Sequence, residues 1–373
     1  MSDLNFPSVT IEDFKQIVKI QLKEENYRPI FGLGLGGIGK TESIIELAKE
    51  ENIGYIDIRL LLYNETDLKG IPYPDVNHIK TIWLQNNILP LAERDGNKGI
   101  LVFDEITSCS RSVRTAAYQL LNERKLGEYN LPDGWIIVCL GNGPEDGGDF
   151  NGMEGNFLNR CSVYSVVPSI PTWCDWALKN NINSLVIAYI RFDMNDFHTF
   201  NSDDDIRIFA SPRSWKAVSD ILNANNDIDN KYTQLRIQGN LGTEVGQKFI
   251  AFCKLKNNAV SADDIIAGRA GHDFKSKELL FITINSLIKL LTDKIKLERQ
   301  NGTISDTFII EMANAINWLL NLNCDGAKEV KMMTFKDITK IDDVLILKLS
   351  QNNKFLYYCP GFMSFVNEFA RLI

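Results

Sequence analysis

The sequence predicts an α/β fold, in which helices cover both faces of a parallel sheet and a mainly helical region follows. Two observations indicate this fold. Five short apolar segments alternate with helical patterns in the first half of the chain, at residues 27–34, 54–61, 99–105, 135–142 and 162–168. Beyond Pro168 the apolar residues recur at helical spacing, most clearly over 277–300 and 307–323. Strands that alternate with helices are typical of βαβ units, whose parallel sheets are buried on both faces.

The composition is that of an ordinary globular protein with a sizeable core. The 373 residues are 45% hydrophobic and 24% charged, which allows two or three domains. A net charge of -8 argues against nucleic acid as the main partner. We find no leader pattern and no apolar run of roughly 20 residues, so we expect a cytoplasmic protein. The seven cysteines are far apart and the three histidines are isolated, which favours reduced, buried thiols over disulfides or a zinc site.

The first element is a predicted helix over residues 10–26. Its apolar residues follow a helical spacing, and Thr10 stands where a helix N-cap is expected. The helix is therefore expected to pack on the core through its apolar face, formed by Ile11, Phe14, Ile17, Val18 and Leu22.

The loop "GLGLGGIGKTES" (32–43) between the next strand and helix satisfies two phosphate-binding patterns. Gly34, Gly36 and Gly39 form G-x-G-x-x-G, the dinucleotide pattern, and Asp57 lies where that pattern places a ribose-binding acid. The range 34–41 also forms G-x-x-x-x-G-K-[ST], the P-loop. The loop by itself leaves both interpretations open.

A second motif decides between them. The P-loop requires a later apolar strand that ends in a metal-binding acid, and "ILVFDE" ends in Asp104 and Glu105. A dinucleotide fold has no use for this pair. An Asp-Glu pair at a strand end often occurs by chance, and a glycine loop can be a simple turn, but the two together favour a nucleotide-hydrolysing site.

Each residue of this predicted site has a chemical role. Lys40 offers a charge to the β- and γ-phosphates of ATP, and Thr41 and Asp104 offer oxygen ligands to Mg²⁺. Glu105 is placed to polarise the attacking water. The predicted nucleotide-binding residues of the loop are Gly34, Leu35, Gly36, Gly37, Ile38, Gly39, Lys40, Thr41 and Glu42.

Three further polar residues are candidates for the same chemistry. Asn142 ends the strand "IIVCLGN", where its amide can contact the γ-phosphate or the water, although an asparagine that begins a turn is the alternative. Arg160 precedes the last strand, and Arg213 opens a helix of the second region. Either arginine is alternatively a surface ion pair of little energetic value.

Together these segments resemble the AAA+ ATPases, and specifically the MoxR-like branch. The loop matches Walker A, "ILVFDE" Walker B, Asn142 sensor 1, "LNR" with Arg160 the arginine finger, and "SPRS" with Arg213 sensor 2. Residues 65–72 resemble the hairpin inserted in the second helix of that branch, and residues 123–138 the hairpin before sensor 1. The resemblance is strong over 28–177. The chain departs from it after Glu105, where "ITSCSRS" replaces the common Asn-Arg, and Arg111 is only a nearby candidate for that arginine.

We expect the chain to divide into an N-terminal helix (1–26), an ATPase core (27–168), a helical lid (169–300) and a C-terminal helical or mixed extension (301–373). The resemblance implies a ring of identical subunits, typically six, in which Arg160 acts on the neighbour's nucleotide and Arg213 acts within its own chain. The expected function is ATP-driven remodelling or chaperoning of a protein, and a von Willebrand A domain protein is an expected partner. Two alternatives stay open: a nucleotide-dependent binding module with little turnover, and a DNA-directed motor, against which the acidic charge weighs.

The end of the chain carries no pattern of that family. Residues 344–373 mix strand-like and helical stretches, and they are expected to extend the helical lid or to form a docking surface. Tyr357, Tyr358 and Phe362 are expected to be core residues.

Overall fold

The computed structural model describes residues 6–25, 27–77, 79–84, 87–143, 155–201, 208–225, 227–301 and 304–370. The chain forms two compact units. The first consists of Met1–Thr172 and Phe200–Ile206, and the second of Trp173–Thr199 and Arg207–Ile373.

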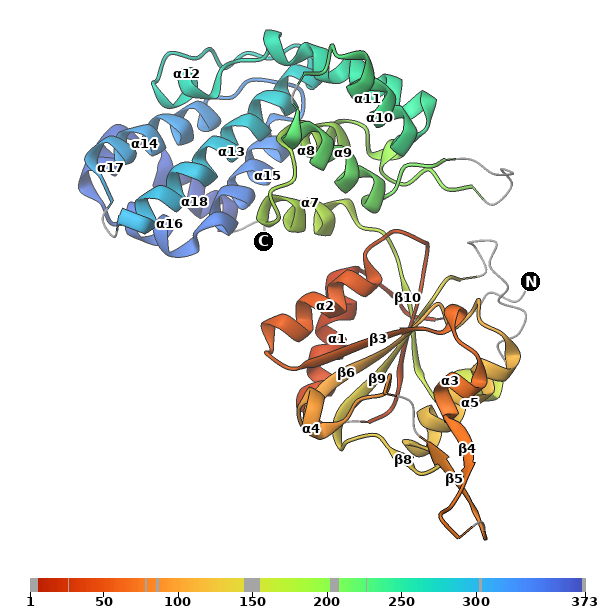
Figure 1. Cartoon of the computed structure of the whole chain (residues 1–373). Helices are drawn as coiled ribbons and strands as arrows, with labels where there is room; N and C mark the ends of the chain where they lie inside the picture. Colours follow the sequence, from red (N-terminus) through yellow and green to blue (C-terminus); the bar gives the residue numbers. More distant parts are fainter. Residues whose placement is uncertain are drawn as a thin grey trace. The chain divides into compact units, whose positions relative to one another are not determined.

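A six-stranded parallel sheet forms the centre of the first unit (Figure 1). Its strands, in spatial order, are β1 (Ser8–Val9), β10 (Ser162–Val166), β2 (Ile30–Leu33), β9 (Gly134–Gly141), β6 (Lys98–Asp104) and β3 (Gly54–Arg59). All five pairings are parallel. The five predicted strands are therefore confirmed as one parallel sheet, and the two-residue β1 is an addition too short to leave a sequence pattern.

The central strands β2, β9 and β6 contain uninterrupted apolar runs, which favours a position inside the sheet. All four residues of β2 are buried, as are residues 99–103 of β6 and 135–141 of β9, which suits strands covered on both faces. Strand β9 lies between β2 and β6, with Phe31 opposite Cys139 and Val102 opposite Val138. Because the three strands are parallel, their carboxyl ends share one edge of the sheet.

Helices cover both faces of this sheet (Figure 1). On one face, α1 (Ile11–Lys23) and α2 (Lys40–Glu50) pack residues such as Phe14 and Ile44 against Val102 and Val138. On the other face, α5 (Arg111–Glu123) packs against the opposite side chains of β2 and β6. Helix α1 begins as predicted, because the Thr10 side chain accepts a hydrogen bond from the Asp13 amide and forms a capping box.

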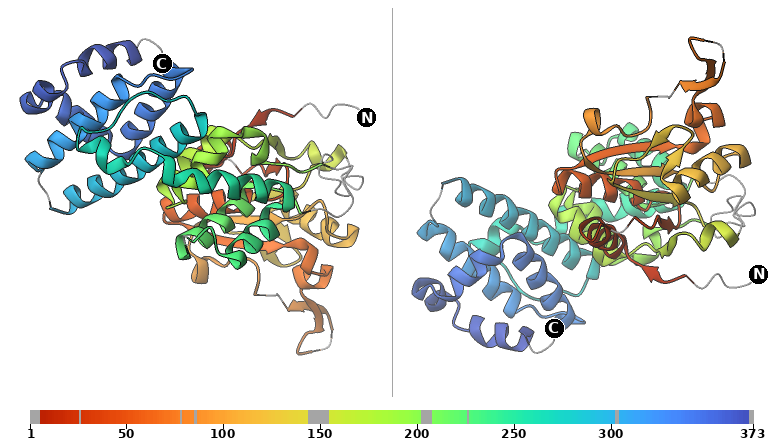
Figure 2. Two further views of the ribbon diagram at one scale, coloured as in Figure 1. Left: turned by 90° about the horizontal axis from the view of Figure 1, so that it is seen from above. Right: turned by 90° about the horizontal axis from the view of Figure 1, so that it is seen from below.

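Two hairpins extend the first unit. Strands β4 (Ile71–Pro74) and β5 (Thr81–Leu84) pair antiparallel and stand out from the sheet in each view (Figures 1 and 2). The expectation of a hairpin at 65–72 is wrong by several residues, because Asn64 caps the short helix α3 (Glu65–Lys69) and Gly70 ends it at a φ of 86°. The hairpin predicted within 123–138 is confirmed as β7 (Lys125–Leu126) and β8 (Tyr129–Asn130).

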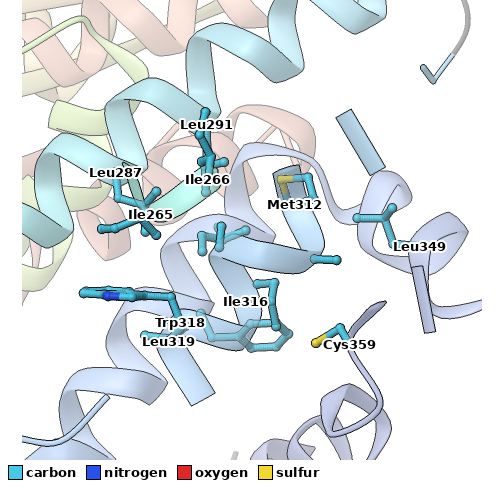
Figure 3. Close-up of a cluster of buried hydrophobic side chains, with 14 of the residues drawn as sticks. Ile265, Ile266, Leu287, Leu291, Met312, Ile316, Trp318, Leu319, Leu349 and Cys359 are labelled. Atoms are coloured by element: carbon cyan, nitrogen blue, oxygen red, sulfur yellow. The ribbon is translucent and has the colours of Figure 1, made fainter. Parts of the chain in front are cut away.

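The described residues of the second unit form helices joined by loops, with an isolated β-bridge between Asp273 and Asn323. Its main helices are α7 (Ile170–Lys179), which begins just before the unit, α8 (Ser184–Phe192), α9 (Pro212–Ala224), α10 (Lys231–Leu241), α11 (Thr243–Lys254), α12 (Ala262–Ile266), α13 (Lys277–Asn301), α14 (Asp306–Leu320), α15 (Ala327–Ile341), α16 (Asp343–Ser350), α17 (Asn353–Tyr358) and α18 (Phe362–Ala370). A hydrophobic cluster around α13 and α14 includes Leu287, Met312, Ile316 and Leu349 (Figure 3). This core contains residues from both sides of position 300.

The expectation of strand-like structure near the C-terminus is wrong for the described residues. Asp342 and Asn352 cap α16 and α17 by accepting hydrogen bonds from the amides of Leu345 and Phe355. Of the residues between the two caps, Leu345, Ile346 and Leu349 pack on the helical core. Phe362 is buried as expected, but Tyr357 is 80% exposed and Tyr358 is 39% exposed. The two tyrosines lie near the end of the short helix α17, whose Phe355 is the residue that enters the core.

All seven cysteines are free thiols, and six of them are buried, as predicted. Among the helices of the described ranges, none combines the length and apolar composition needed to cross a lipid bilayer.

Candidate active site

The glycine loop joins the end of β2 to the start of α2, at the carboxyl edge of the sheet. Gly39 is the N-cap of α2 with a φ of 97°, a conformation that favours glycine. Gly34 is required for another reason, because a Cβ atom there would lie 2.2 Å from the carbonyl oxygen of Val166. The loop thus leads directly into a helix N-terminus, where free N–H groups and the helix dipole attract phosphate.

Only part of the predicted nucleotide-binding set is available through side chains. Leu35 and Ile38 pack into the hydrophobic cluster beneath α1 and α2, so only their backbone faces a ligand in the loop. Glu42 is exposed in the first turn of α2. Gly36 and Gly37 lie in a turn of the loop before α2, with Gly37 at a φ of 76°.

Lys40 lies inside the loop. Its side chain is largely buried, and Nζ donates hydrogen bonds to the carbonyl oxygens of Gly34 at 2.7 Å and Leu35 at 2.9 Å. The ammonium group is therefore held within the loop, by the carbonyl groups of Gly34 and Leu35. This is the position from which a lysine reaches phosphate oxygens bound over the helix N-terminus.

Thr41 and Asp104 are in contact, although 63 residues separate them in the sequence. Thr41 Oγ1 donates to Asp104 Oδ2 at 2.8 Å, and the other carboxylate oxygen accepts the amide of Glu105 at 2.9 Å. Hydroxyl and carboxylate oxygens are the ligands that Mg²⁺ prefers, so this pair fits the predicted metal. In the described ranges, no group of three or more His, Cys, Asp or Glu is placed to hold a metal on its own.

Glu105 has an unusual backbone conformation. Its φ is 56°, in the left-handed region that costs a residue with a side chain about 1–3 kcal/mol. The turn that follows is held by two backbone hydrogen bonds, from the Ser108 amide to the Glu105 carbonyl at 3.0 Å and from the Ile106 amide to the Leu140 carbonyl at 3.2 Å. Strain of this kind persists where the surrounding structure fixes the residue, and it is common at active sites.

Asn142 directly follows β9, the strand adjacent to β6. Its amide donates to Thr107 Oγ1 at 3.1 Å, and the neighbouring Gly141 carbonyl accepts the amide of Gly34 at 3.2 Å. The structure thus brings the P-loop, Asp104, Glu105 and Asn142 to one edge of the sheet. Ligands of open α/β sheets bind at this carboxyl edge.

Arg160 is not part of this group. It lies in the turn before β10, at the amino edge of the sheet, where Arg28 donates to the carbonyls of Asn159 and Cys161. Ser162 is opposite Ile30 in the register, and Gly34 is four residues beyond Ile30. At about 3.3 Å per residue, the P-loop begins about 13 Å further along the sheet. Arg160 is exposed and lies at the opposite edge of the sheet from its own P-loop.

The other two candidate arginines, Arg213 and Arg111, are exposed. Arg213 is the second residue of α9 in the helical unit, after the cap residue Ser211 and Pro212 at the first helical position. Its approach to a nucleotide stays a prediction. Arg111 is the first residue of α5, one residue after the cap Ser110.

Asp57 is the residue that the dinucleotide pattern places as a ribose-binding acid. It lies within β3, opposite Val102, and its Oδ1 atom is buried without a hydrogen-bond partner. Burial and the nearby charge of Asp104 raise the pKa of Asp57 to about 6, against the opposing effect of Arg59. The alternation of β3 explains the placement, because Asp57 shares a face with Arg59, which is opposite Asp104.

Sequence reasoning missed two residues that support the site. Thr107 is 1% exposed beneath the Glu105 turn. Arg114 on α5 donates to the carbonyls of Thr107 at 3.3 Å and Cys109 at 3.0 Å. Neither belongs to a motif, because each acts through contacts between separate elements.

No protein-family model and no curated protein matches the sequence. Among solved structures, the chain is similar to a protein named "putative ATPase" from Cytophaga hutchinsonii, with 13% identity over 87% of this chain and 81% of that one. The TM-score is 0.33, too low to argue from. The fold and the candidate site therefore rest on the strand order and contacts described above.

Proposed function

We propose that this chain binds ATP with Mg²⁺ and hydrolyses it to ADP and phosphate. The observation that carries the proposal is the 2.8 Å contact between Thr41 and Asp104, which joins the P-loop helix to the strand that ends in the Asp-Glu pair. A loop that only bound a dinucleotide would not need the acidic pair Asp104 and Glu105 at the end of β6. Lys40 lies beside the contact, within the same loop.

Binding follows from the loop and the start of α2. The backbone N–H groups of residues 36–41 and the helix dipole hold the phosphates, and Lys40 exchanges its carbonyl partners for phosphate oxygens. Thr41 and Asp104 would hold Mg²⁺, which would neutralise part of the phosphate charge.

Hydrolysis follows from the residues beyond β6 and β9. Glu105 orients a water molecule and accepts its proton as the water oxygen bonds to the γ-phosphorus. The bond from that phosphorus to the bridging oxygen breaks, and the bridging oxygen leaves with ADP. Asn142, at the end of the adjacent strand, donates its side-chain amide to the γ-phosphate or to the water.

We further propose that Arg160 acts on the nucleotide of a second, identical chain. Support comes from its place at the amino edge of the sheet, whereas its own P-loop lies at the carboxyl edge. An arginine supplied by a neighbour stabilises the charge of the transition state, commonly by about 10³–10⁵ in rate. Such an arrangement requires an assembly, and a six-membered ring is the form we propose.

The same proposal includes a mechanical output. Arg213 at the start of α9 senses the nucleotide and moves the helical unit, as in other switching proteins whose domains close on a ligand. The β4–β5 hairpin exposes Ile71, Tyr73, Val76 and Ile79, which suits contact with a protein client. A von Willebrand A domain protein is the partner that we propose to test first.

Steady-state phosphate release tests the proposed activity. Glu105→Gln should bind ATP as the wild type does and lower turnover by about 10²–10⁴-fold, because the amide cannot accept the proton. Glu123→Gln, at the exposed end of α5, is the matched control and should turn over normally. Normal turnover by Glu105→Gln would remove its assigned role. ATP-dependent assembly of the wild type without phosphate release would instead indicate a binding module.

A further inference from the structure

Thr107 joins the Glu105 turn to the end of β9. It lies two residues after Glu105 and is 1% exposed. Its Oγ1 atom accepts the backbone amide of Asn142 at 3.1 Å. The hydroxyl therefore links Asn142, which follows β9, to the turn that follows the adjacent strand β6.

The methyl side of Thr107 makes a second contact with β9. A Cβ atom built on Gly141 would lie 2.6 Å from Thr107 Cγ2 and 2.9 Å from Oγ1, so the threonine packs directly on bare glycine backbone. The Gly141 carbonyl in turn accepts the amide of Gly34, the first residue of the P-loop motif. Thr107 thus lies against the same short piece of backbone that contacts the P-loop.

The opposite side of the turn is also held. Arg114 donates to the carbonyls of Thr107 and Cys109, and this fixes the turn to α5. Between these contacts Glu105 keeps its φ of 56°. A strained residue keeps such a conformation only while its neighbours impose it, so the position of Thr107 bears on the direction of the Glu105 carboxylate.

We propose that Thr107 is a positioning residue that couples Asn142 to Glu105, an inference that rests on the proposed ATPase function. When Asn142 binds the nucleotide, its backbone pulls on the Thr107 hydroxyl, and the turn brings Glu105 toward the water. The hydroxyl is the essential group, because it is the acceptor of the Asn142 backbone amide.

Two substitutions that each remove one part of the side chain test this role in the full-length protein. Thr107→Val keeps the shape and removes the acceptor, whereas Thr107→Ser keeps the acceptor and removes the methyl group. We expect Thr107→Val to lower kcat about tenfold, which corresponds to about 1.4 kcal/mol. The ATP dissociation constant and the KM should change less than about twofold, because Thr107 is not itself a predicted ligand of the phosphates and its hydrogen bond to Asn142 involves the backbone amide, not the side chain. Thr107→Ser should keep most of the kcat.

Two results of this kinetic comparison would overturn the inference. One is a Thr107→Val variant with normal kcat, and the other is a Thr107→Ser variant as impaired as Thr107→Val. The second result would mean that packing, and not the hydroxyl, is what the site needs.

Hydrogen exchange separates this inference from the activity itself. In the nucleotide-free protein, Thr107→Val should speed exchange in the peptide 139–143 by about tenfold, because the Asn142 amide has lost its acceptor. AMP-PNP with Mg²⁺ should then protect residues 104–109 in the wild type and in Thr107→Ser, but not in Thr107→Val. If the wild type released no phosphate, the ATPase proposal would fail while this measurement still decided the coupling. Equal protection of 104–109 in all three proteins would exclude the coupling.

Discussion

The guanidinium group of Arg160 lies over the ring of Tyr118, with Cζ 4.9 Å from the ring centroid. Tyr118 in turn packs against Phe157 at 5.7 Å, and Phe157 meets Phe31 of β2 edge-on at 5.8 Å. The direction of this arginine is therefore set by a stack of rings that begins on the P-loop strand. Because Tyr118 and Arg114 are one turn apart on α5, the same helix supports both Arg160 and the Glu105 turn.

Removing the ring beneath Arg160 should weaken hydrolysis in the assembly. A cation–π contact at an exposed site contributes about 0.5–1 kcal/mol, so Tyr118→Leu should lower kcat by about two- to fivefold. Tyr118→Phe keeps the ring and should stay within about twofold of the wild type. Phosphate release measured at several protein concentrations checks both variants. Equal rates for the two variants would show that the ring does not support Arg160.

Mixing two inactive variants should restore activity if Arg160 acts on a neighbouring chain. Arg160→Ala should bind ATP and lose about 10³-fold or more in turnover, and Glu105→Gln should also be inactive. A mixed assembly contains interfaces in which an intact Glu105 meets an intact Arg160 from the other variant. Phosphate release should therefore rise to a maximum at intermediate mixing ratios. Absence of rescue at every ratio would contradict the shared site.

The features that the sequence predicts well are local ones. The strands 27–34 and 99–105 appear as apolar runs, and the Thr10 cap is a pattern of four residues. The proximity of Thr41 and Asp104 also follows from local motifs, because the carboxyl ends of parallel strands meet at one edge. Their role in binding a metal stays a prediction.

The features that the sequence does not predict depend on contacts between distant elements. The Thr107–Asn142 hydrogen bond exists because β9 lies beside β6, and 35 residues separate the two partners. The buried position of the Asp57 carboxylate within β3 depends on the register of β3 with β6, which continues to Arg59 and Asp104. The exposure of Tyr357 likewise depends on which face of a short helix meets the core.

Asp57 should make the stability of the first unit depend on pH. Its folded-state pKa is raised from 3.8 to about 6, so an ionised Asp57 destabilises the fold. Below 3.8 both states hold the proton, and between 3.8 and about 6 only the folded state holds it. The stabilisation by Asp57→Asn relative to the wild type should therefore grow as the pH rises through this window and stay constant above it. Urea unfolding in magnesium-free buffer measures the difference, and a difference that is the same at every pH would contradict the prediction.

In the helical unit, Arg191 of α8 and Asp337 of α15 form a buried ion pair. Their atoms Nη2 and Oδ2 lie 2.8 Å apart, with the side chains 6% and 5% exposed, and Arg191 also donates to Asn285 of α13. Burial raises the pKa of Asp337 even though the charge of Arg191 opposes this. The pair therefore links three helices at a cost in desolvation.

Breaking this pair from one side should destabilise the helical unit more than removing it altogether. Asp337→Leu leaves the Arg191 charge buried and should lower the free energy of unfolding by about 3–5 kcal/mol. The double variant Arg191→Met with Asp337→Leu buries no charge and should recover most of this loss. The exposed pair Lys216–Asp220 is the control, and Asp220→Ala should cost at most about 1 kcal/mol. Urea unfolding followed by circular dichroism measures all four proteins. A double variant as unstable as Asp337→Leu would mean that the pair itself, and not the avoidance of a lone buried charge, stabilises this unit.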